Sequence, residues 1–181
     1  MADNQAGPGG LMPTGWLRAG TAPNDYYMGI DREESHGGSS SGYVMARVEK
    51  SKGFGTLMQA FKADHYVGKR IRLSAYVKVE EVGVWAGLWM RVDGQTGASM
   101  AFDNMQDRPI RGTADWQRYE IVLDVPEESV NIAFGFLLAG PGTVWADDFD
   151  IEVVGEEVPV TDMRKKMKPL PEEPVNLDFE L

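Results

Sequence analysis

The stretch that decides the fold runs from residue 85 to residue 116 and reads WAGLWMRVDGQTGASMAFDNMQDRPIRGTADW. Its first part alternates between two kinds of side chain, and side chains of a strand change face at every residue. One face is apolar and predicts a core; it consists of Ala86, Leu88, Met90 and Val92. The opposite face carries Trp85, Trp89 and Arg91, and two indoles beside a guanidinium are costly to expose and unusual to bury.

A glycine-rich turn follows this strand. Asp93, Gly94 and Gly97 are typical of a hairpin turn, and they lead into a second predicted strand over Ser99–Met105. A dense polar cluster, Asp107-Arg108-Pro109, comes next. We expect this hairpin to form the wall of whatever site the protein has.

Composition limits the classes of function. The 181 residues include no cysteine, which excludes disulfides, cysteine-ligated zinc and thiol catalysis. The net charge of −10 repels phosphate backbones and anionic lipids, so neither nucleic acid nor a membrane is an expected partner. No apolar run reaches the roughly 18 residues of a membrane span, and the first residues lack the pattern of a signal peptide. We therefore expect a cytoplasmic setting.

Alternating segments recur along the chain at spacings that suit short strands joined by Gly, Pro and Asp turns. They predict an all-β protein, a single antiparallel β-sandwich. The expected strands besides the hairpin are 43–49, 56–62, 70–79, 117–125, 130–138 and 143–154. The expected divisions of the chain are a disordered segment at 1–13, the sandwich at 14–154, a Pro/Glu-rich linker at 155–174 and a last strand at 175–181.

Three segments resemble one family of domains. They are His36–Val44 (HGGSSSGYV), Tyr66–Lys78 (YVGKRIRLSAYVK) and Trp145–Glu152 (WADDFDIE). They are similar to the turn, the central strand and the closing strand of carbohydrate-binding-module-like (galactose-binding-like) jelly rolls, which occur alone or fused to bacterial regulators and hydrolases. The resemblance implies a jelly-roll topology.

The C-terminal segment Asn176–Glu180 (NLDFE) resembles the strand that normally comes first in that family. Here it comes last, and its apolar residues alternate with polar ones. The resemblance therefore implies a permuted jelly roll in which this segment fills the first-strand position. If the linker is too short or too stiff, a neighbouring molecule would fill that position, giving a homodimer by C-terminal strand exchange.

The first candidate site is a concave face lined by Trp, Arg and Asp. It comprises Trp85, Trp89, Arg91, Asp103 and Met105, with Trp145 or Met58. Indole faces pack on sugar C–H surfaces while Arg and Asp bond hydroxyls, so a carbohydrate ligand is expected, although an apolar small molecule would suit the same residues. In the alternative interpretation, both indoles form a second layer of core beneath a loop within 14–42.

The second candidate site is the polar cluster after the hairpin, which consists of Asp103, Asn104, Asp107 and Arg108, with Arg111. It is either a ligand clamp or acid–base pair, or an Asx turn and a buried ion pair that pin a loop.

A structural calcium ion is implied by the family resemblance. Carried over to this chain, its ligands are Asp147 or Asp148, Glu180 and carbonyl oxygens of the 36–39 loop. Hard oxygen ligands of this kind suit Ca²⁺. Without an ion, the same acids would be exposed or hydrogen-bonded.

These observations favour a non-catalytic small-molecule-binding module, most simply carbohydrate-binding, with no catalytic residue assigned. One alternative is an enzyme of lyase, isomerase or cyclase type that uses the same cavity. Another is a structural or effector-sensing module that acts through a partner. A shallow open groove favours binding, whereas a deep pocket with a perturbed carboxylate favours chemistry.

Overall fold

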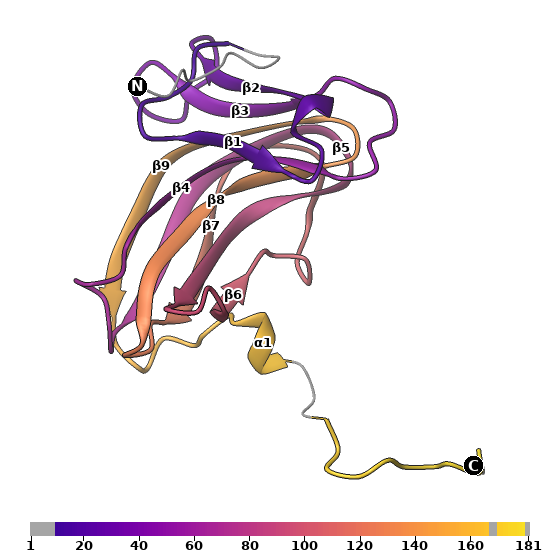
Figure 1. Ribbon diagram of the computed structural model, residues 1–181. Coiled ribbons are helices and arrows are strands. Elements are labelled where there is room, and N and C mark those ends of the chain that lie inside the picture. Colours follow the sequence, from indigo (N-terminus) through magenta and orange to yellow (C-terminus); the bar gives the residue numbers. More distant parts are fainter. Residues whose placement is uncertain (1–9, 167–169, 180–181) are drawn as a thin grey trace.

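The computed structural model describes residues 10–166 and 170–179, and nearly every regular element among them is a strand (Figure 1). The strands are β1 (Leu17–Gly20), β2 (Tyr26–Asp31), β3 (Ser41–Ala46), β4 (Phe54–Lys62), β5 (Arg70–Gly94), β6 (Ser99–Asp103), β7 (Ile110–Asp124), β8 (Ser129–Ala139) and β9 (Thr143–Val154). A 3₁₀ turn, η1 (Pro23–Asp25), precedes β2, and a single helical turn, α1 (Met163–Lys166), follows β9. The prediction of an all-β chain is confirmed.

Two antiparallel layers share one long strand. The C-terminal half of β5 pairs with β8 and β6, and β8 continues through β4 to β1. The N-terminal half of β5 pairs with β7 and β9, and β9 continues through β3 to β2. We call these layers the first and the second sheet. The curved strands of the two layers are visible in Figure 1, and the arrangement is the jelly-roll sandwich that the sequence predicted.

The sequence predicted two separate strands where the structure has one of 25 residues. The pairing of β5 with β7 shifts register at three places between Val77 and Ala86, and Glu81 there has a φ of 52°. Such bulges bend a strand without ending it. The chain therefore crosses from the second sheet to the first with no loop.

The core lies between the two sheets. Ala86, Leu88, Met90 and Val92, predicted to face inward, are all 0% exposed. They pack with inward residues of the second sheet in one continuous cluster. Because the alternation of the strand is strict, Trp85, Trp89 and Arg91 lie on the outer face of the first sheet.

The predicted boundaries at the N-terminal end need correction. Residues 1–9 lie outside the described part of the chain. Within the supposedly disordered 10–13, however, Leu11 accepts a hydrogen bond from the backbone N–H of Ile30 at 2.8 Å, and Met12 packs on the core. The ordered domain therefore begins before residue 14.

The segment after β9 is not a plain linker either. Thr161 donates its backbone N–H to the carbonyl of Val122, and the buried carboxylate of Asp162 accepts the N–H of Phe102 at 3.3 Å. Arg164 donates to the carbonyl oxygen of Ser99. These bonds fix α1 against β6.

The predicted last strand is wrong for the single chain. Residues 175–179 form no strand, and Val175, Leu177 and Phe179 are 70%, 74% and 88% exposed. Figure 1 shows the segment leaving the sheets beyond α1. Alternation over so few residues is a weak signal, and the prolines before it hold the chain extended, away from an edge strand.

Among the described residues, no helix is long and apolar enough to cross a membrane.

Candidate functional site

A groove of about 480 Å³ lies on the outer face of the first sheet, along the strand that carries both indoles. Five strands and the turn after β1 contribute to it, and it opens to solvent on one side. Its walls are Ala19, Gly20, Thr21, Phe54, Thr56, Met58, Trp85, Trp89, Arg91, Phe102, Asn104 and Leu137. We call it the Trp85 groove.

Trp85 forms one wall and is only partly buried. Gly87 makes room for its ring, because a Cβ added at Gly87 would lie 3.3 Å from the indole Nε1 and 3.1 Å from the Cβ of Met105. The indole N–H is covered and has no acceptor among the described residues. An unsatisfied buried donor is rare in folded proteins and is typically explained by a ligand, a water or a functional constraint.

Trp89 forms the floor and is only 7% exposed. Its Nε1–H donates to the hydroxyl oxygen of Thr56 at 2.8 Å, and that hydroxyl donates to the carbonyl of Phe136 at 2.7 Å. The ring packs with Ala133 and Leu137 of β8 in a small cluster separate from the main core. One indole is therefore a buried support, as the second-layer interpretation expected, while a cavity remains beside it.

Arg91 lies on the same face with its side chain 43% exposed. Its Nε donates to Oδ1 of Asp93 at 2.8 Å, and Oδ2 of Asp93 accepts the side-chain amide of Asn131 at 2.9 Å. The guanidinium carbon is 6.0 Å from the centroid of the Trp89 ring. The guanidinium is thus held in place by neighbours that leave its two Nη groups without a partner among the described residues.

The other members of the first predicted site lie elsewhere. Asp103 is 0% exposed and faces the interior, and Met105 is buried, where its sulfur accepts the backbone N–H of Leu88. They alternate with Phe102 and Asn104, which do line the groove. Placing Asp103 and Met105 among the groove walls was wrong. Neighbouring residues of β6 point to opposite faces, so Asp103 lies on the face opposite to Phe102. Met105 follows the end of that strand with a φ of 58° and is buried.

The cluster after β6 pins a loop. Arg108 donates through Nη1 and Nη2 to the two carboxylate oxygens of Asp103 at 3.1 and 2.5 Å, and Asp103 also accepts the backbone N–H of Met105. Burial by itself lowers the pKa of Arg108, but Asp103 and Asp107 raise it above its ordinary value. Lys166 in turn bonds Asp107 and lowers the pKa of that carboxyl. The geometry is that of the loop-pinning alternative, outside the Trp85 groove.

Trp145 lies on the outer face of the second sheet, on the other side of the sandwich. Its Nε1–H donates to Asp31 at 2.9 Å, and the ammonium of Lys78 lies 5.5 Å from its ring centroid and pairs with Glu34. The prediction that Trp145 joins Trp85 was wrong, whereas Met58, the other possibility, lines the groove. Strands predicted from sequence carry no information on which sheet they join.

The loop before β3 folds onto this same face. The ring of His36 stacks on Tyr76 with centroids 3.6 Å apart, and its Nδ1 lies 2.7 Å from Oδ2 of Asp148. Together with Asp31, Glu34, Lys78 and Trp145 these residues form what we call the Trp145 cluster.

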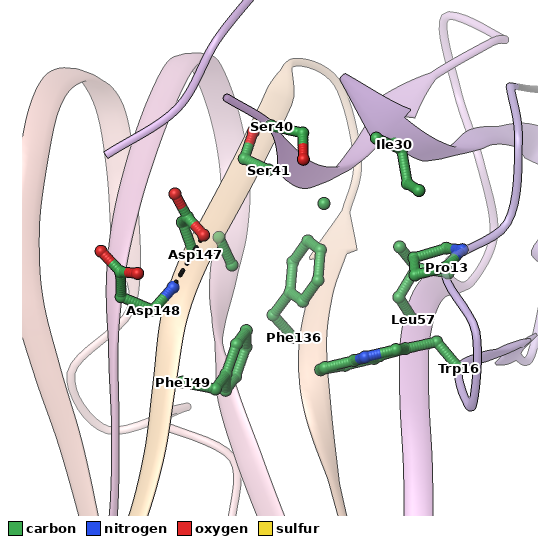
Figure 2. A pocket seen from close by; sticks show the side chains of 12 residues that line it. Pro13, Trp16, Ile30, Ser40, Ser41, Leu57, Phe136, Asp147, Asp148 and Phe149 are labelled. Carbon is green, nitrogen blue, oxygen red and sulfur yellow. Dashed lines mark hydrogen bonds between the residues drawn. The ribbon is translucent and has the colours of Figure 1, made fainter. Parts of the chain in front are cut away.

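Asp147 and Asp148, the predicted calcium ligands, stand at the rim of a second cleft of about 310 Å³ (Figure 2). Aromatic residues such as Trp16, Phe136 and Phe149 form its other walls (Figure 2). Asp147 accepts the backbone N–H groups of His36 and Gly37 at 2.9 and 3.1 Å. The loop therefore turns N–H donors towards the acid, where the prediction placed carbonyl oxygens.

The described residues include no cluster of metal-binding side chains. No group of three or more His, Asp or Glu side chains within 10–166 and 170–179 could hold a metal ion. Glu180, the third predicted ligand, lies outside these ranges. Calcium binding stays a prediction.

Comparison with known proteins supports the fold. No family model matches the chain. It is 50% identical over 167 residues to the Bacillus subtilis (strain 168) protein YbfP, described as an uncharacterized HTH-type transcriptional regulator. The match covers 92% of this chain and 56% of the relative, so the chain spans little more than half the length of that protein.

Solved structures show the same architecture. The xylan-binding domain CBM22-1 of Paenibacillus barcinonensis Xyn10C matches with a TM-score of 0.52 and 14% identity, over 83% of this chain and 98% of that domain. The CBM22-1–GH10 modules of Clostridium thermocellum Xyn10B, solved with xylohexaose, match with a TM-score of 0.56 and 19% identity, over 78% and 26%. The Fischerella cyclase FisC matches with a TM-score of 0.54 and 15% identity, over 79% and 86%. At these identities the likeness shows the fold, which is the jelly roll of carbohydrate-binding modules.

The sequence reasoning missed several walls of the groove. Phe54 and Thr56 were not predicted, although they alternate along β4 with Met58, which was, and form one line with it beside Trp89. Ala19, Gly20 and Thr21 carried no such signal, because β1 has only four residues.

Proposed function

We propose that the chain is a non-catalytic binding module whose Trp85 groove holds a small molecule, with a sugar as the leading class. The observation that carries the proposal is an open groove of about 480 Å³ beside two indoles and a guanidinium. This volume lies within the roughly 300–1,000 Å³ typical of ligand sites.

The chemistry of the walls supports a sugar. Trp85 and Phe102 offer apolar ring surface, while Arg91 and Asn104 offer hydrogen-bond donors at its edge. Sugar rings present C–H faces and hydroxyl edges, and such a mixture of surfaces complements them. Xylan-binding modules of the same fold add support from analogy alone.

The groove favours binding over the enzymatic alternatives. No carboxylate or imidazole is among the described residues that line it. A lyase, isomerase or cyclase needs groups that move protons at the reacting atoms, and a guanidinium such as that of Arg91 is poorly suited to that role.

A sensing role is a second proposal, supported by the relative that is an HTH-type regulator. Ligand binding by this chain would then set the DNA affinity of a neighbouring DNA-binding domain, in the cytoplasm. The test is whether a ligand found for this chain changes the DNA affinity of the Bacillus relative.

Tryptophan fluorescence tests the binding proposal directly. Titration with a panel of neutral and acidic mono- and oligosaccharides should give a saturable change for at least one of them. Trp85→Ala should weaken that ligand about tenfold or more, as removal of an aromatic anchor does. Trp116→Ala is the matched control, since Trp116 is also partly buried but lies on β7 beside His36. A flat response to the whole panel, or equal losses in both variants, contradicts a sugar in the groove.

A further inference from the structure

We infer that the Trp85 groove selects ligands that carry a carboxylate, which binds at the Arg91 end. The inference rests on the proposed function, since it assigns a ligand chemistry to the same groove. The preference for a carboxylate follows from which polar side-chain groups of the groove already have hydrogen-bond partners and which do not.

Each side-chain hydroxyl or amide oxygen of the groove already accepts one hydrogen bond from within the chain. The Thr56 hydroxyl accepts from Trp89 and donates to a backbone carbonyl. Thr21 Oγ1 accepts the backbone N–H of Phe54 at 3.0 Å, and Asn104 Oδ1 accepts that of Gln106 at 3.1 Å. A ligand donor would therefore meet few open oxygens on these side chains.

The groups left over are donors. Neither Nη of Arg91 has a partner among the described residues, nor has the side-chain N–H₂ of Asn104. A neutral sugar hydroxyl both donates and accepts, whereas a carboxylate only accepts. A set of unengaged donors thus matches a carboxylate better than a hydroxyl.

The position of Arg91 strengthens this match. It is the charged residue among the described walls, and the rest of the surface around it is mainly aromatic and aliphatic. Asp93, itself bonded by Asn131, accepts from the Nε of the guanidinium, and neither Nη has a partner among the described residues. A guanidinium edge binds carboxylates through paired hydrogen bonds, and these bonds are stronger beside apolar surface than in water.

The overall charge of −10 does not oppose such a site. Exposed charges are screened beyond roughly 8 Å at physiological ionic strength, so the groups near the groove decide. Asp93, the acid that contacts Arg91, is paired through one oxygen with that guanidinium and through the other with the side-chain amide of Asn131.

Matched ligand pairs test the inference. D-glucuronate against D-glucose, and D-galacturonate against D-galactose, differ only at C6; phenylacetate against 2-phenylethanol makes the same comparison for an aromatic ligand. In each pair that binds, the acid should bind about tenfold or more tightly, as expected for hydrogen bonds to a charged group. Binding of the aromatic acid alone supports the inference and overturns the sugar class of the proposed function.

Variants connect the preference to one residue. Arg91→Gln should abolish the preference for the acid, and Arg91→Lys should keep part of it, because lysine retains the charge but loses the planar edge. Arg118→Gln is the matched control, since Arg118 is 42% exposed and pairs with Glu120 on the other sheet. Melting temperatures show whether each variant is folded.

These experiments separate a failure of the carboxylate inference from a failure of the proposed function. If a neutral sugar binds in the groove as tightly as its uronate, or if Arg91→Gln and Arg91→Lys both keep the preference, the inference is wrong and the proposed function stands. If no acid and no neutral ligand binds, both are wrong.

Discussion

The Trp85 groove and the Trp145 cluster lie on opposite outer faces of one sandwich and use similar residue types. Each combines tryptophan with a cation. In the Trp145 cluster, the indole N–H bonds Asp31, Lys78 pairs with Glu34, and His36 contacts both Asp148 and Tyr76. In the Trp85 groove, Arg91 has one internal partner and the Trp85 N–H has none among the described residues.

The difference shows how aromatic residues that hold a fold together differ from those available to a ligand. At the Trp145 cluster, Asp31 of β2 and Glu34 and His36 of the loop that follows it pair with polar groups from within the chain. Among the described residues that line the Trp85 groove, the Nη groups of Arg91 and the side-chain N–H₂ of Asn104 have no such partner, so these donors stay available to a ligand. Both faces combine tryptophan with a cation, but only the Trp145 cluster also has carboxylates that satisfy its donors, whereas none is among the described residues that line the Trp85 groove.

The largest expected effect is on stability, from Trp145→Ala. Trp145 is 9% exposed, and truncating a buried tryptophan costs about 3 kcal/mol or more. Trp85→Ala should cost roughly half of that, because its ring is only partly buried. Urea unfolding measures both.

The effect on ligand affinity should be the reverse of the effect on stability. Trp145→Ala should leave the affinity for the ligand unchanged, whereas Trp85→Ala should weaken it. If Trp145→Ala also abolishes binding in folded protein, the two faces do not differ as described.

Acid should weaken the Trp145 cluster. Burial by itself raises the pKa of Asp31, but hydrogen bonds from Trp145 and from the backbone N–H groups of Glu33 and Glu34, with the charge of Lys78, leave that pKa below its usual value. A lowered native pKa contributes stability above the unfolded pKa, about 3.9, and that contribution is lost as pH falls through the native pKa. Stability linked to Asp31 is therefore present at pH 7 and decreases below about pH 4.

Melting curves between pH 7 and pH 3 check this expectation. Asp31→Asn should lower the melting temperature at pH 7 and flatten its decrease in acid, whereas Glu173→Gln, on the exposed tail, should change neither. Parallel curves for Asp31→Asn and the wild type would show that Asp31 contributes nothing. A decrease common to all variants is expected from Asp124 and Asp107, whose pKa values are also lowered.

The smallest effect should come from deleting residues 170–181. The described part of this segment, 170–179, is exposed, so the melting temperature should change by less than about 1 °C. For a domain of this size, a change of 1 kcal/mol in the free energy of unfolding shifts the melting temperature by roughly 2–4 °C. A decrease of several degrees, together with a dimer that becomes a monomer in size-exclusion chromatography, would instead indicate C-terminal strand exchange.

Much of the first sheet could be predicted from the sequence. Strict alternation over Ala86, Leu88 and Met90 identified both the core face and the opposite face with its two tryptophans. The same rule, applied one strand further, would have separated Phe102 from Asp103, whereas Asn104 and Met105 lie beyond the end of β6.

The rest depended on long-range pairing. Trp145 carries the same residue-level signal as Trp85, and only the pairing of β9 with β3 and with the first half of β5 places it on the other sheet. The tail shows the opposite error, because its alternation predicted a strand although no sheet edge receives it in the single chain. The local alternation of a strand specifies which of its residues share a face, while its pairing with other strands specifies which sheet that face belongs to.

The five indole N–H signals of a ¹⁵N-labelled sample give the most direct test, since the chain has five tryptophans. During titration with a ligand that changes the fluorescence, the signals of Trp85 and Trp89 should move and saturate together, while that of Trp145 stays in place. Movement of the Trp145 signal without that of Trp85, at saturating ligand, would contradict a binding site in the Trp85 groove.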